Sequence, residues 1–169
     1  YNAQAAVDTE SMLVVAIDMA QVATDKQQLE PMLKALAGLP EALGSVKQVL
    51  ADNGYFSAAN VEHCLNAKVE PLLAAGRDKH HPNWEERFTE PPPLTEPASH
   101  VDRMKHRLKT VQGRALYALR KQTVEPVFGI IKSVMRFRQF LLRGLAAVRG
   151  EWTLVTMAWN IKRMAVMAR

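Results

Sequence analysis

The chain has 169 residues, of which 48% are hydrophobic and 23% are charged, with a formal net charge of +5 at pH 7. This composition fits one globular domain with a buried core and excludes a disordered chain. The single cysteine, Cys64, excludes an internal disulfide and favours a reducing compartment, so we expect a cytoplasmic protein. No apolar run approaches the ~18 residues that span a bilayer, and no signal peptide is visible.

The first forty residues predict a β-hairpin and a helix. "YNAQAAV" ends at an acidic turn and "MLVVAIDMA" is a short run rich in β-branched residues, which together suggest an antiparallel pair of strands. A helix that begins close before Pro31, or bends there, is predicted next, with Thr24 or Asp25 as its cap and Gly38 at its end. Its apolar stripe has helical spacing: Leu29, Met32, Leu33 and Leu36.

The middle of the chain alternates strand and helix. "KQVLAD" predicts a short strand, "SAANVEHCLNA" a helix capped by Ser57 with Val61, Cys64 and Leu65 on one face, and "KVEPLLAAG" a strand weakened by Pro71. Residues 77–100 are polar and proline-rich, which predicts a loop. The fold class is therefore α/β, a mixed sheet flanked by helices.

The last third of the chain, residues 101–169, predicts a basic helical part with helices over about 101–109, 114–135 and 145–167. It contains 15 Lys or Arg and 3 Asp or Glu, whereas residues 1–100 contain 7 and 14. Such a basic half is the electrostatic signature of a protein that binds a polyanion; the alternative is a solvated basic surface. The buried face of the last helix is predicted from the spacing of Trp152 and Trp159, with Val148, Val155 and Ile161 near it.

Two acids stand out by their surroundings. Asp52 closes an apolar strand and precedes Asn53-Gly54, which is where ligands gather in open α/β sheets, although the same residues also make a plain turn. Glu125 is the one acid between Asp102 and Glu151, inside a basic segment. A helix over this segment places one stripe of side chains together, with Arg120 at its edge and Pro126 as a possible interruption: Tyr117, Lys121, Glu125 and Lys132. The alternative is a surface glutamate paired with lysines.

If the fold brings Asp52 and Glu125 together, their carboxylates repel by roughly 4 kcal/mol at ~4 Å and an effective dielectric of 20. A divalent cation removes that repulsion. Hard oxygen ligands suit Mg²⁺ or Mn²⁺.

The segments "VLADNGYFSAANV", "YALRKQTVEPVFGIIK" and "FLLRGLAAVRGEWTLVTMAWN" together resemble the catalytic domain of bacterial insertion-sequence transposases of the DDE class. The resemblance covers nearly the whole chain and implies an RNase H-like fold. It also implies transposition of DNA, by metal-dependent phosphodiester hydrolysis and strand transfer at the ends of the element. A homodimer in the active complex and association with the nucleoid follow from the same resemblance.

The resemblance implies that Asp52 and Glu125 are the second and third catalytic acids and metal ligands. The family helix carries Tyr, two residues, Arg, three residues, Glu, six residues, Lys. Tyr117 with Arg120, and Glu125 with Lys132, keep the outer gaps, so either Arg120 or Lys121 contacts phosphate. The expected DNA-binding residues are Tyr117, Arg120, Lys121, Lys132, Arg136, Arg138 and Arg143. Tyr117 stacks on a displaced base or, alternatively, packs in the core.

The first catalytic acid is expected elsewhere. "YNAQAAVD" resembles the second strand of the family, so the first strand, with its Asp, is expected upstream of Tyr1 and residues 1–169 form a partial domain. Asp8 at the hairpin turn and Asp18 on the next strand are poor substitutes. An alternative is therefore a truncated, inactive remnant that binds DNA or a full-length transposase, and a third is a plain helical DNA-binding module.

Other candidate sites are weaker. The five histidines, His63, His80, His81, His100 and His106, come without a CxxC or HExxH motif, which argues against a zinc site. Cys64 is expected in the core.

Overall fold

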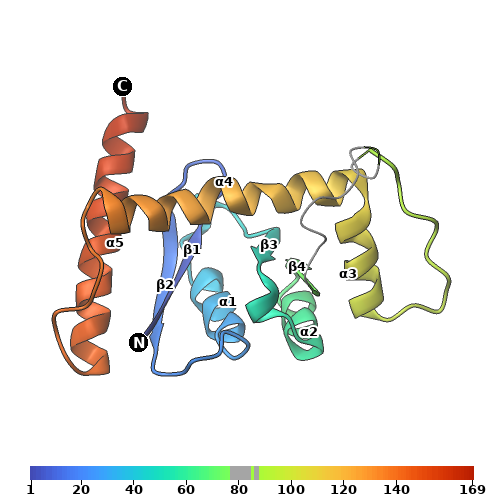
Figure 1. The fold of residues 1–169 in the computed structure, drawn as a ribbon, viewed down its shortest axis with the longest axis horizontal. Helices are drawn as coiled ribbons and strands as arrows, with labels where there is room; N and C mark the ends of the chain where they lie inside the picture. Colours follow the sequence, from blue (N-terminus) through green and yellow to red (C-terminus); the bar gives the residue numbers. More distant parts are fainter. Residues whose placement is uncertain (77–84, 86–87) are drawn as a thin grey trace.

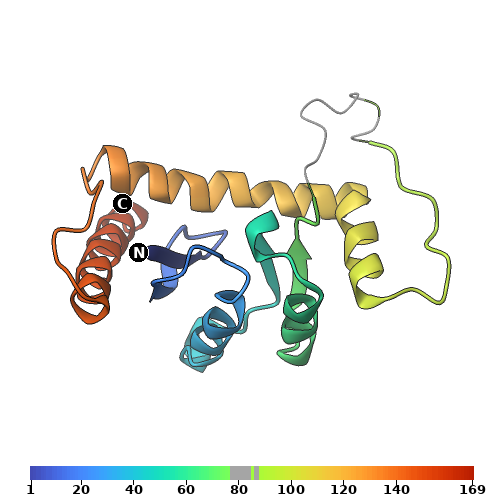
Figure 2. The same ribbon diagram turned by 60° about the horizontal axis from the view of Figure 1, so that its bottom comes forward.

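The computed structural model describes residues 1–76, 85 and 88–169. The elements, in chain order, are β1 (Asn2–Val7), β2 (Val14–Ala20), α1 (Leu29–Ala37), η1 (Glu41–Leu43), β3 (Gln48–Ala51), η2 (Asn53–Tyr55), α2 (Ala58–Asn66), β4 (Glu70–Leu73), α3 (His100–Lys109), α4 (Val111–Ser133) and α5 (Leu145–Met167). Figures 1 and 2 show the long helix α4 lying across the strands, α1 and α2, with α5 at one of its ends and α3 at the other.

The strands form two separate pairs in the described part of the chain. β1 and β2 are antiparallel, with Asn2 opposite Ala20 and a bulge between Ala6 and Val7, whereas β3 and β4 are parallel. The α/β class is confirmed, and the predicted hairpin is present. The expected mixed sheet is split into these two pairs, and the hairpin is linked to the turn after β3 by a side-chain hydrogen bond from the Tyr55 hydroxyl to Gln4.

Each pair of strands has its own apolar core. The hairpin core lies between the hairpin, α4 and α5, and the β3–β4 core lies among α1, α2, α3 and the parallel strands. The buried members of the hairpin core are Val14, Met19, Val127, Ile131, Val148, Trp152 and Trp159. Those of the β3–β4 core are Leu29, Leu33, Ala51, Val61, Cys64, Val69, Leu73 and Met104.

Helix α4 ties the two cores together. It is continuous from Val111 to Ser133, so Pro126 does not interrupt the helix, as the sequence left possible. Thr110 caps its first turn by accepting a hydrogen bond from the Gly113 amide. Gly113 is buried, and a Cβ there would lie 1.8 Å from the Arg107 carbonyl oxygen, so only glycine fits this α3–α4 junction.

Three side-chain predictions were wrong. Asp25 does not cap α1, whose first turn follows Gln28 without a side-chain cap; the Asp25 carboxylate bonds to β1 instead. Leu65 and Ile161 were expected on buried faces, but both are exposed, because α2 and α5 bury narrower stripes than the apolar residues suggest. Among the described residues, no helix is both long and apolar enough to cross a membrane.

Candidate active site

Asp52 lies at the point where β3 ends. Its backbone is extended, and its Oδ1 accepts a hydrogen bond of 2.9 Å from the Gly54 amide, so it caps the short helix η2. The side chain is exposed at this end of the parallel pair. Both the turn and the position expected of a ligand-binding acid are therefore present.

A ring of hydrogen bonds fixes this turn against the hairpin. Gln4 of β1 donates to Asp25 Oδ1 at 3.0 Å, and its carbonyl oxygen Oε1 accepts from the Tyr55 hydroxyl. Asn60 of α2 donates from Nδ2 to the carbonyl oxygens of Tyr55 (2.6 Å) and Lys26 (2.8 Å), which closes the ring next to Asp25. Gln4 and Asn60 are both buried, so these bonds are partly shielded from water.

Gly54 is the point at which Asp25 and Asp52 come together. A Cβ at this residue would lie 3.0 Å from Asp25 Oδ2 and 3.0 Å from Asp52 Oδ1. Two carboxylates therefore border one small space, which a Cβ at residue 54 would crowd. Sequence reasoning placed Asp25 in a helix cap and missed this pairing.

The same two carboxylates affect the pKa of the Tyr55 phenol. Its burial raises the pKa of the phenol strongly, and the negative charges of Asp25 and then Asp52 raise it further, against a smaller opposing effect of the hydrogen bond to Gln4. The hydroxyl therefore stays protonated at neutral pH and remains a donor to Gln4.

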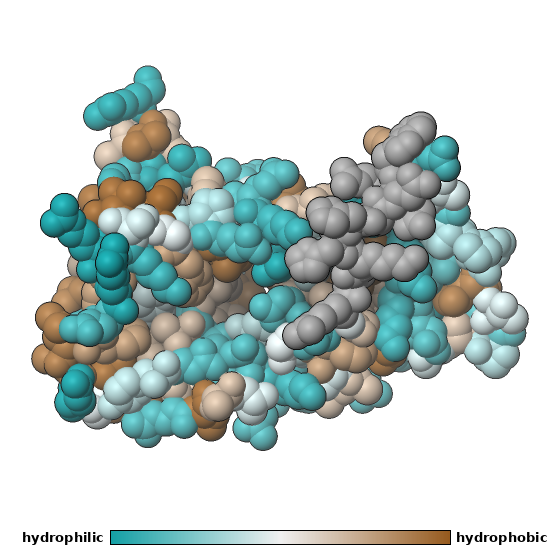
Figure 3. Space-filling view, in the orientation of Figure 1, coloured by the Kyte–Doolittle hydropathy of each residue, from teal (hydrophilic) through white to brown (hydrophobic). Residues whose placement is uncertain are grey.

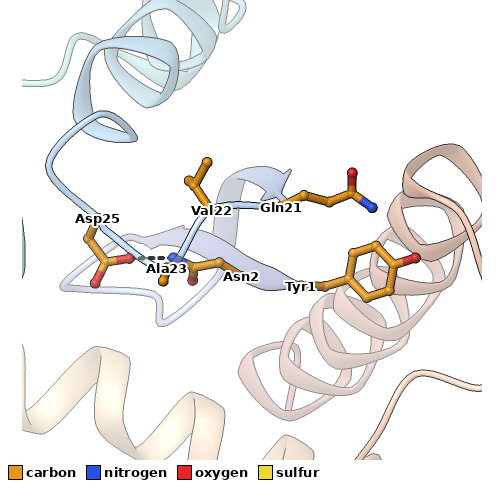
Figure 4. A pocket seen from close by; sticks show the side chains of 6 residues that line it. All are labelled: Tyr1, Asn2, Gln21, Val22, Ala23 and Asp25. Carbon is orange, nitrogen blue, oxygen red and sulfur yellow. Dashed lines mark hydrogen bonds between the residues drawn. The ribbon is translucent and has the colours of Figure 1, made fainter.

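An open pocket of about 530 Å³ adjoins this ring. It is lined by Tyr1, Asn2, Gln21, Val22, Ala23 and Asp25. Figure 4 shows the Asn2 amide reaching across the pocket to Asp25 Oδ1, a hydrogen bond of 2.6 Å. The pocket lies between the start of β1 and the loop after β2.

Helix α4 passes close to the end of β3. The Tyr117 hydroxyl donates to the Ala51 carbonyl oxygen at 3.2 Å, one residue before Asp52. Glu125 lies eight residues further, about 12 Å along the helix axis. Its Oε1 is 3.2 Å from Arg120 Nη2, and the Arg120 guanidinium also lies 5.7 Å from the centre of the Tyr117 ring.

These contacts distinguish Arg120 from Lys121, the two residues that could contact a DNA phosphate. Only 19% of the Arg120 side chain is exposed, and it is paired with Glu125. Lys121 is exposed. The half-buried Tyr117 fits core packing better than base stacking, because its hydroxyl is engaged by β3.

The remaining basic residues continue along and beyond the end of α4. Lys132 is exposed, with its ammonium 5.9 Å from the centre of the Phe128 ring. Arg136 and Arg138 are exposed and, with Ser133, line an open hollow of about 470 Å³. Arg143 donates to the carbonyl oxygens of Phe140 and Leu142.

Residues 1–161 match the family described as transposase DDE domain. The chain belongs to this family. Searches of curated proteins and of solved structures gave no match. A function in DNA transposition and binding to DNA follow from membership of this transposase family.

The structure gives the other acids local roles. Asp8 of the transposase domain accepts hydrogen bonds from the Ser11 hydroxyl and amide in the hairpin turn. Partial burial raises the pKa of the Asp8 carboxyl, but the hydrogen bonds outweigh burial, so that the pKa lies below its ordinary value. Asp18 accepts from Arg149 Nη2 at 2.7 Å, which ties β2 to α5.

Within the described ranges, no group of three His, Cys, Asp or Glu side chains gathers closely enough to hold a metal ion. His80 and His81 lie outside the described residues. Cys64 is buried as expected, and burial raises the pKa of its thiol to about 11.

Proposed function

We propose that this DDE domain catalyses metal-dependent phosphodiester hydrolysis and strand transfer at the ends of a bacterial insertion sequence, with Asp52 and Glu125 as two of its three acids. The observation that carries the proposal is the contact of Tyr117 with Ala51, because it anchors the helix that holds Glu125 to the strand end that holds Asp52. Asp52 lies in the Asp-x-Gly-Tyr segment of the family resemblance, and Glu125 keeps the family's gap of six residues to Lys132, although four residues rather than three separate it from Arg120.

The third acid belongs, in this proposal, to a strand that precedes Tyr1 and lies between β1 and β3 in an RNase H-like sheet. Two observations support it. β1 and β3 each keep one edge without backbone pairing in the described part of the chain. Glu125 is also roughly 12 Å along α4 from Tyr117, a span that a further strand would occupy.

The oxygen donors suit Mg²⁺ or Mn²⁺. Asp52 is exposed and accepts one hydrogen bond, from Gly54, so most of its lone pairs are available for a metal. A bound pair of such ions would activate the attacking hydroxyl and stabilise the leaving oxygen. Asp52 and Glu125 would hold them, and Glu125 would exchange its ion pair with Arg120 for metal.

The basic residues of α4 and the segment after it would bind and orient the DNA backbone. Lys121, Lys132, Arg136 and Arg138 are exposed cations that would neutralise phosphates without reading sequence. Arg120, mostly covered and paired with Glu125, would become available to phosphate when Glu125 takes up metal. We also propose that the protein acts in the bacterial cytoplasm, at the nucleoid, as a homodimer.

The proposal is tested by a cleavage assay on DNA that carries the ends of the element. Residues 1–169 alone should not cut with Mg²⁺, whereas a chain that includes the expected upstream strand should cut and should lose activity on Asp52→Asn. If residues 1–169 alone cut efficiently, Asp8 or Asp18 would be the first catalytic acid. An extended chain that cuts equally well after Asp52→Asn would overturn the assignment of Asp52.

A second candidate is an inactive remnant that binds DNA or a full-length transposase. The ion pair between Glu125 and Arg120 favours it, because this pair occupies the carboxylate that catalysis needs. Its signature would be DNA binding of unchanged strength with no metal-dependent cutting, even in the extended chain.

A further inference from the structure

Asp52 is an exposed carboxylate on a largely hydrophilic part of the surface. In Figure 3, hydrophilic side chains predominate along the middle of the molecule, whereas hydrophobic side chains gather at the end formed by α5. Among the described residues, the Asp52 carboxylate accepts one hydrogen bond, from the Gly54 amide. The last side-chain torsion of an aspartate is broad, so this one bond fixes the carboxylate only if the turn itself is fixed. A catalytic acid must be held to within about 0.5 Å, so the residues that hold the turn matter for the chemistry.

Tyr55 fixes the turn that carries this bond. Its amide donates to the Asp52 carbonyl oxygen at 3.2 Å, and its own carbonyl oxygen accepts from Asn60 Nδ2 at 2.6 Å. Its hydroxyl donates to Gln4 Oε1 on the neighbouring hairpin. Tyr55 is therefore held at both its backbone and its hydroxyl, and a movement of its ring would displace Gly54 and the bond to Asp52.

Asp25 decides which way the Gln4 amide faces. An ionised carboxylate can only accept hydrogen bonds, and Asp25 Oδ1 accepts from both Asn2 Nδ2 (2.6 Å) and Gln4 Nε2 (3.0 Å). The Asn2 amide, turned in this way, offers its oxygen Oδ1 to Gln4 Nε2 at 2.9 Å. Both acceptors draw the nitrogen of Gln4 to the same side, which leaves its oxygen Oε1 facing the Tyr55 hydroxyl.

Asp25 is itself fixed beside the same turn. Its carbonyl oxygen accepts from the Gln28 amide at 2.9 Å, and the next carbonyl oxygen, of Lys26, accepts from Asn60 Nδ2 at 2.8 Å. The second carboxylate oxygen, Oδ2, lies against Gly54, where a Cβ would meet it at 3.0 Å. Asp25 therefore has a fixed place from which it can set the geometry of the turn.

We propose that Asp25 is a positioning residue for Asp52 and does not itself hold metal. It acts through Gln4 and Tyr55. Because Asp52 is taken as a catalytic acid, this role rests on the proposed function. The bonds that orient Asn2 and Gln4 both use one oxygen of Asp25, so the role requires an acceptor, whereas a metal ligand requires the carboxylate. An asparagine at this position separates the two roles.

The first experiment measures cleavage of element ends at saturating DNA and Mg²⁺, in a chain that includes the upstream strand. Asp25→Ala and Tyr55→Phe should each lower the rate about 10–100-fold, the usual cost of losing a residue that orients a ligand. Asp25→Asn should cut within about 3-fold of the parental rate, because its amide oxygen can accept both bonds. Asp102→Ala is the matched control: this carboxylate accepts from the Ser99 hydroxyl at 2.6 Å at the start of α3, and its loss should leave the rate unchanged.

The double variant of Asp25→Ala with Tyr55→Phe tests whether the effect passes through the Tyr55 hydroxyl. If it does, the double variant should cut about as fast as the slower of the two single variants. Independent roles would instead multiply the two losses, to about 100–10,000-fold.

The second experiment uses residues 1–169 without metal or DNA. Exchange of the Gly54 amide with water is followed by ¹H–¹⁵N NMR, because this amide donates to Asp52 Oδ1. Exchange should be roughly 10-fold faster in Asp25→Ala and in Tyr55→Phe, since both release the turn. Asp25→Asn and Asp102→Ala should exchange at the parental rate.

Three results would overturn the proposal. Parental cutting by Asp25→Ala or Tyr55→Phe would mean that Asp52 does not depend on them. An Asp25→Asn variant as slow as Asp25→Ala would make Asp25 a metal ligand, and multiplied losses in the double variant would break the path between the two residues. Circular dichroism checks the fold of every variant, and Tyr55→Phe, which removes a single oxygen, decides alone if Asp25→Ala does not fold.

The proposed function is tested separately by Asp52→Asn in the same cleavage assay. If this variant cuts at the parental rate, the catalytic assignment of Asp52 fails, and the role of Asp25 in catalysis fails with it. If Asp52→Asn is inactive while Asp25→Ala cuts at the parental rate, the positioning role alone is overturned.

Discussion

Asp52 is held in place by residues that lie far from it in the sequence. Gln4, Asp25 and Asn60 come from a strand, a loop and a helix, and Tyr55 connects them to the turn. Because Gln4 and Asn60 are buried, the loss of one bond leaves its partner unsatisfied, at about 1–3 kcal/mol. The turn is therefore sensitive to changes of a single atom.

Gly54→Ala should disturb this turn. The new Cβ would meet the Asp25 and Asp52 carboxylate oxygens at 3.0 Å, so one of them must move. We expect a loss of roughly 1–2 kcal/mol in the free energy of unfolding, measured by urea titration. Gly129→Ala is the control, because nothing lies within 4 Å of its Cβ and alanine in a helix should stabilise by about 0.5–1 kcal/mol. Equal effects of the two substitutions would contradict the crowding at Gly54.

Glu125→Gln should separate chemistry from affinity. In a chain that includes the upstream strand, cleavage should fall by orders of magnitude, because the amide cannot hold a divalent metal as a carboxylate does. Binding to DNA should hold or tighten slightly, since a negative charge near phosphate is removed and Arg120 is released from its ion pair. Cutting at the parental rate would make Glu125 a surface glutamate without catalytic role.

Lys132→Ala is the complementary change. If Lys132 neutralises one phosphate, DNA binding should weaken, and the slope of log K against log salt should shrink by about 0.9. Cleavage at saturating DNA should fall less than for Glu125→Gln. Filter binding in a salt titration, beside the cleavage assay, gives both quantities.

At the scale of the elements, α5 is fastened to the hairpin by side chains that bond to backbone. Asn160 accepts from the Val14 amide and donates to the Val14 carbonyl oxygen, both at 2.8 Å. The indole nitrogens of Trp152 and Trp159 donate to the carbonyl oxygens of Gln4 and Met12. These bonds fix the face of α5 that packs inward and leave Leu154, Met157 and Ile161 exposed.

Asn160→Asp should weaken this attachment strongly. One carboxylate oxygen can still accept from the Val14 amide, but the other replaces a donor and faces the Val14 carbonyl oxygen. The expected cost is about 2–3 kcal/mol in the free energy of unfolding at neutral pH. Asn66→Asp, at the exposed end of α2, should change stability by no more than about 0.5 kcal/mol. Urea unfolding followed by tryptophan emission compares the two.

The elements themselves could be predicted from local pattern. The helical stripe of Leu29 and Leu36, the Ser57 cap and the bounds of α5 need only sequence spacing, and each is present. The positions of Asp25 and Ile161 could not be predicted in this way. A helix-cap signal carries no information about the strand that the fold places beside Asp25, and an apolar side chain does not reveal which face of its helix packs inward. The hydrogen-bonded ring next to Asp52 connects residues from Gln4 to Asn60, which are 56 positions apart.

Over the whole molecule, acidic and basic residues are separated along the chain. The basic part lies on α3, α4, α5 and the segment between the last two, with Arg136 and Arg138 exposed beside one hollow. Such an arrangement favours one surface for DNA and makes affinity strongly dependent on salt.

Removal of two cations from this surface should change the slope of log K for DNA binding against log salt concentration. The double substitution of Arg136 and Arg138 by alanine should reduce the slope of log K by about 1.8, if each neutralises one phosphate. Lys34→Ala, on α1 and paired with Glu30 at 2.7 Å, should leave it unchanged. A slope that is insensitive to the arginine pair would place the DNA on another face.

The division of the interior into two cores has a consequence for cooperativity. The hairpin core contains Trp152 and Trp159, whereas the buried residues of the β3–β4 core include no tryptophan. The emission of Trp152 and Trp159 therefore follows the opening of one half of the molecule, and amide hydrogen exchange in β3 and β4 follows the other. The halves are linked by α4, by the ring at Gln4 and by the packing of α1 against β2. Cutting the ring should therefore weaken their coupling, so that these two signals melt at more widely separated temperatures.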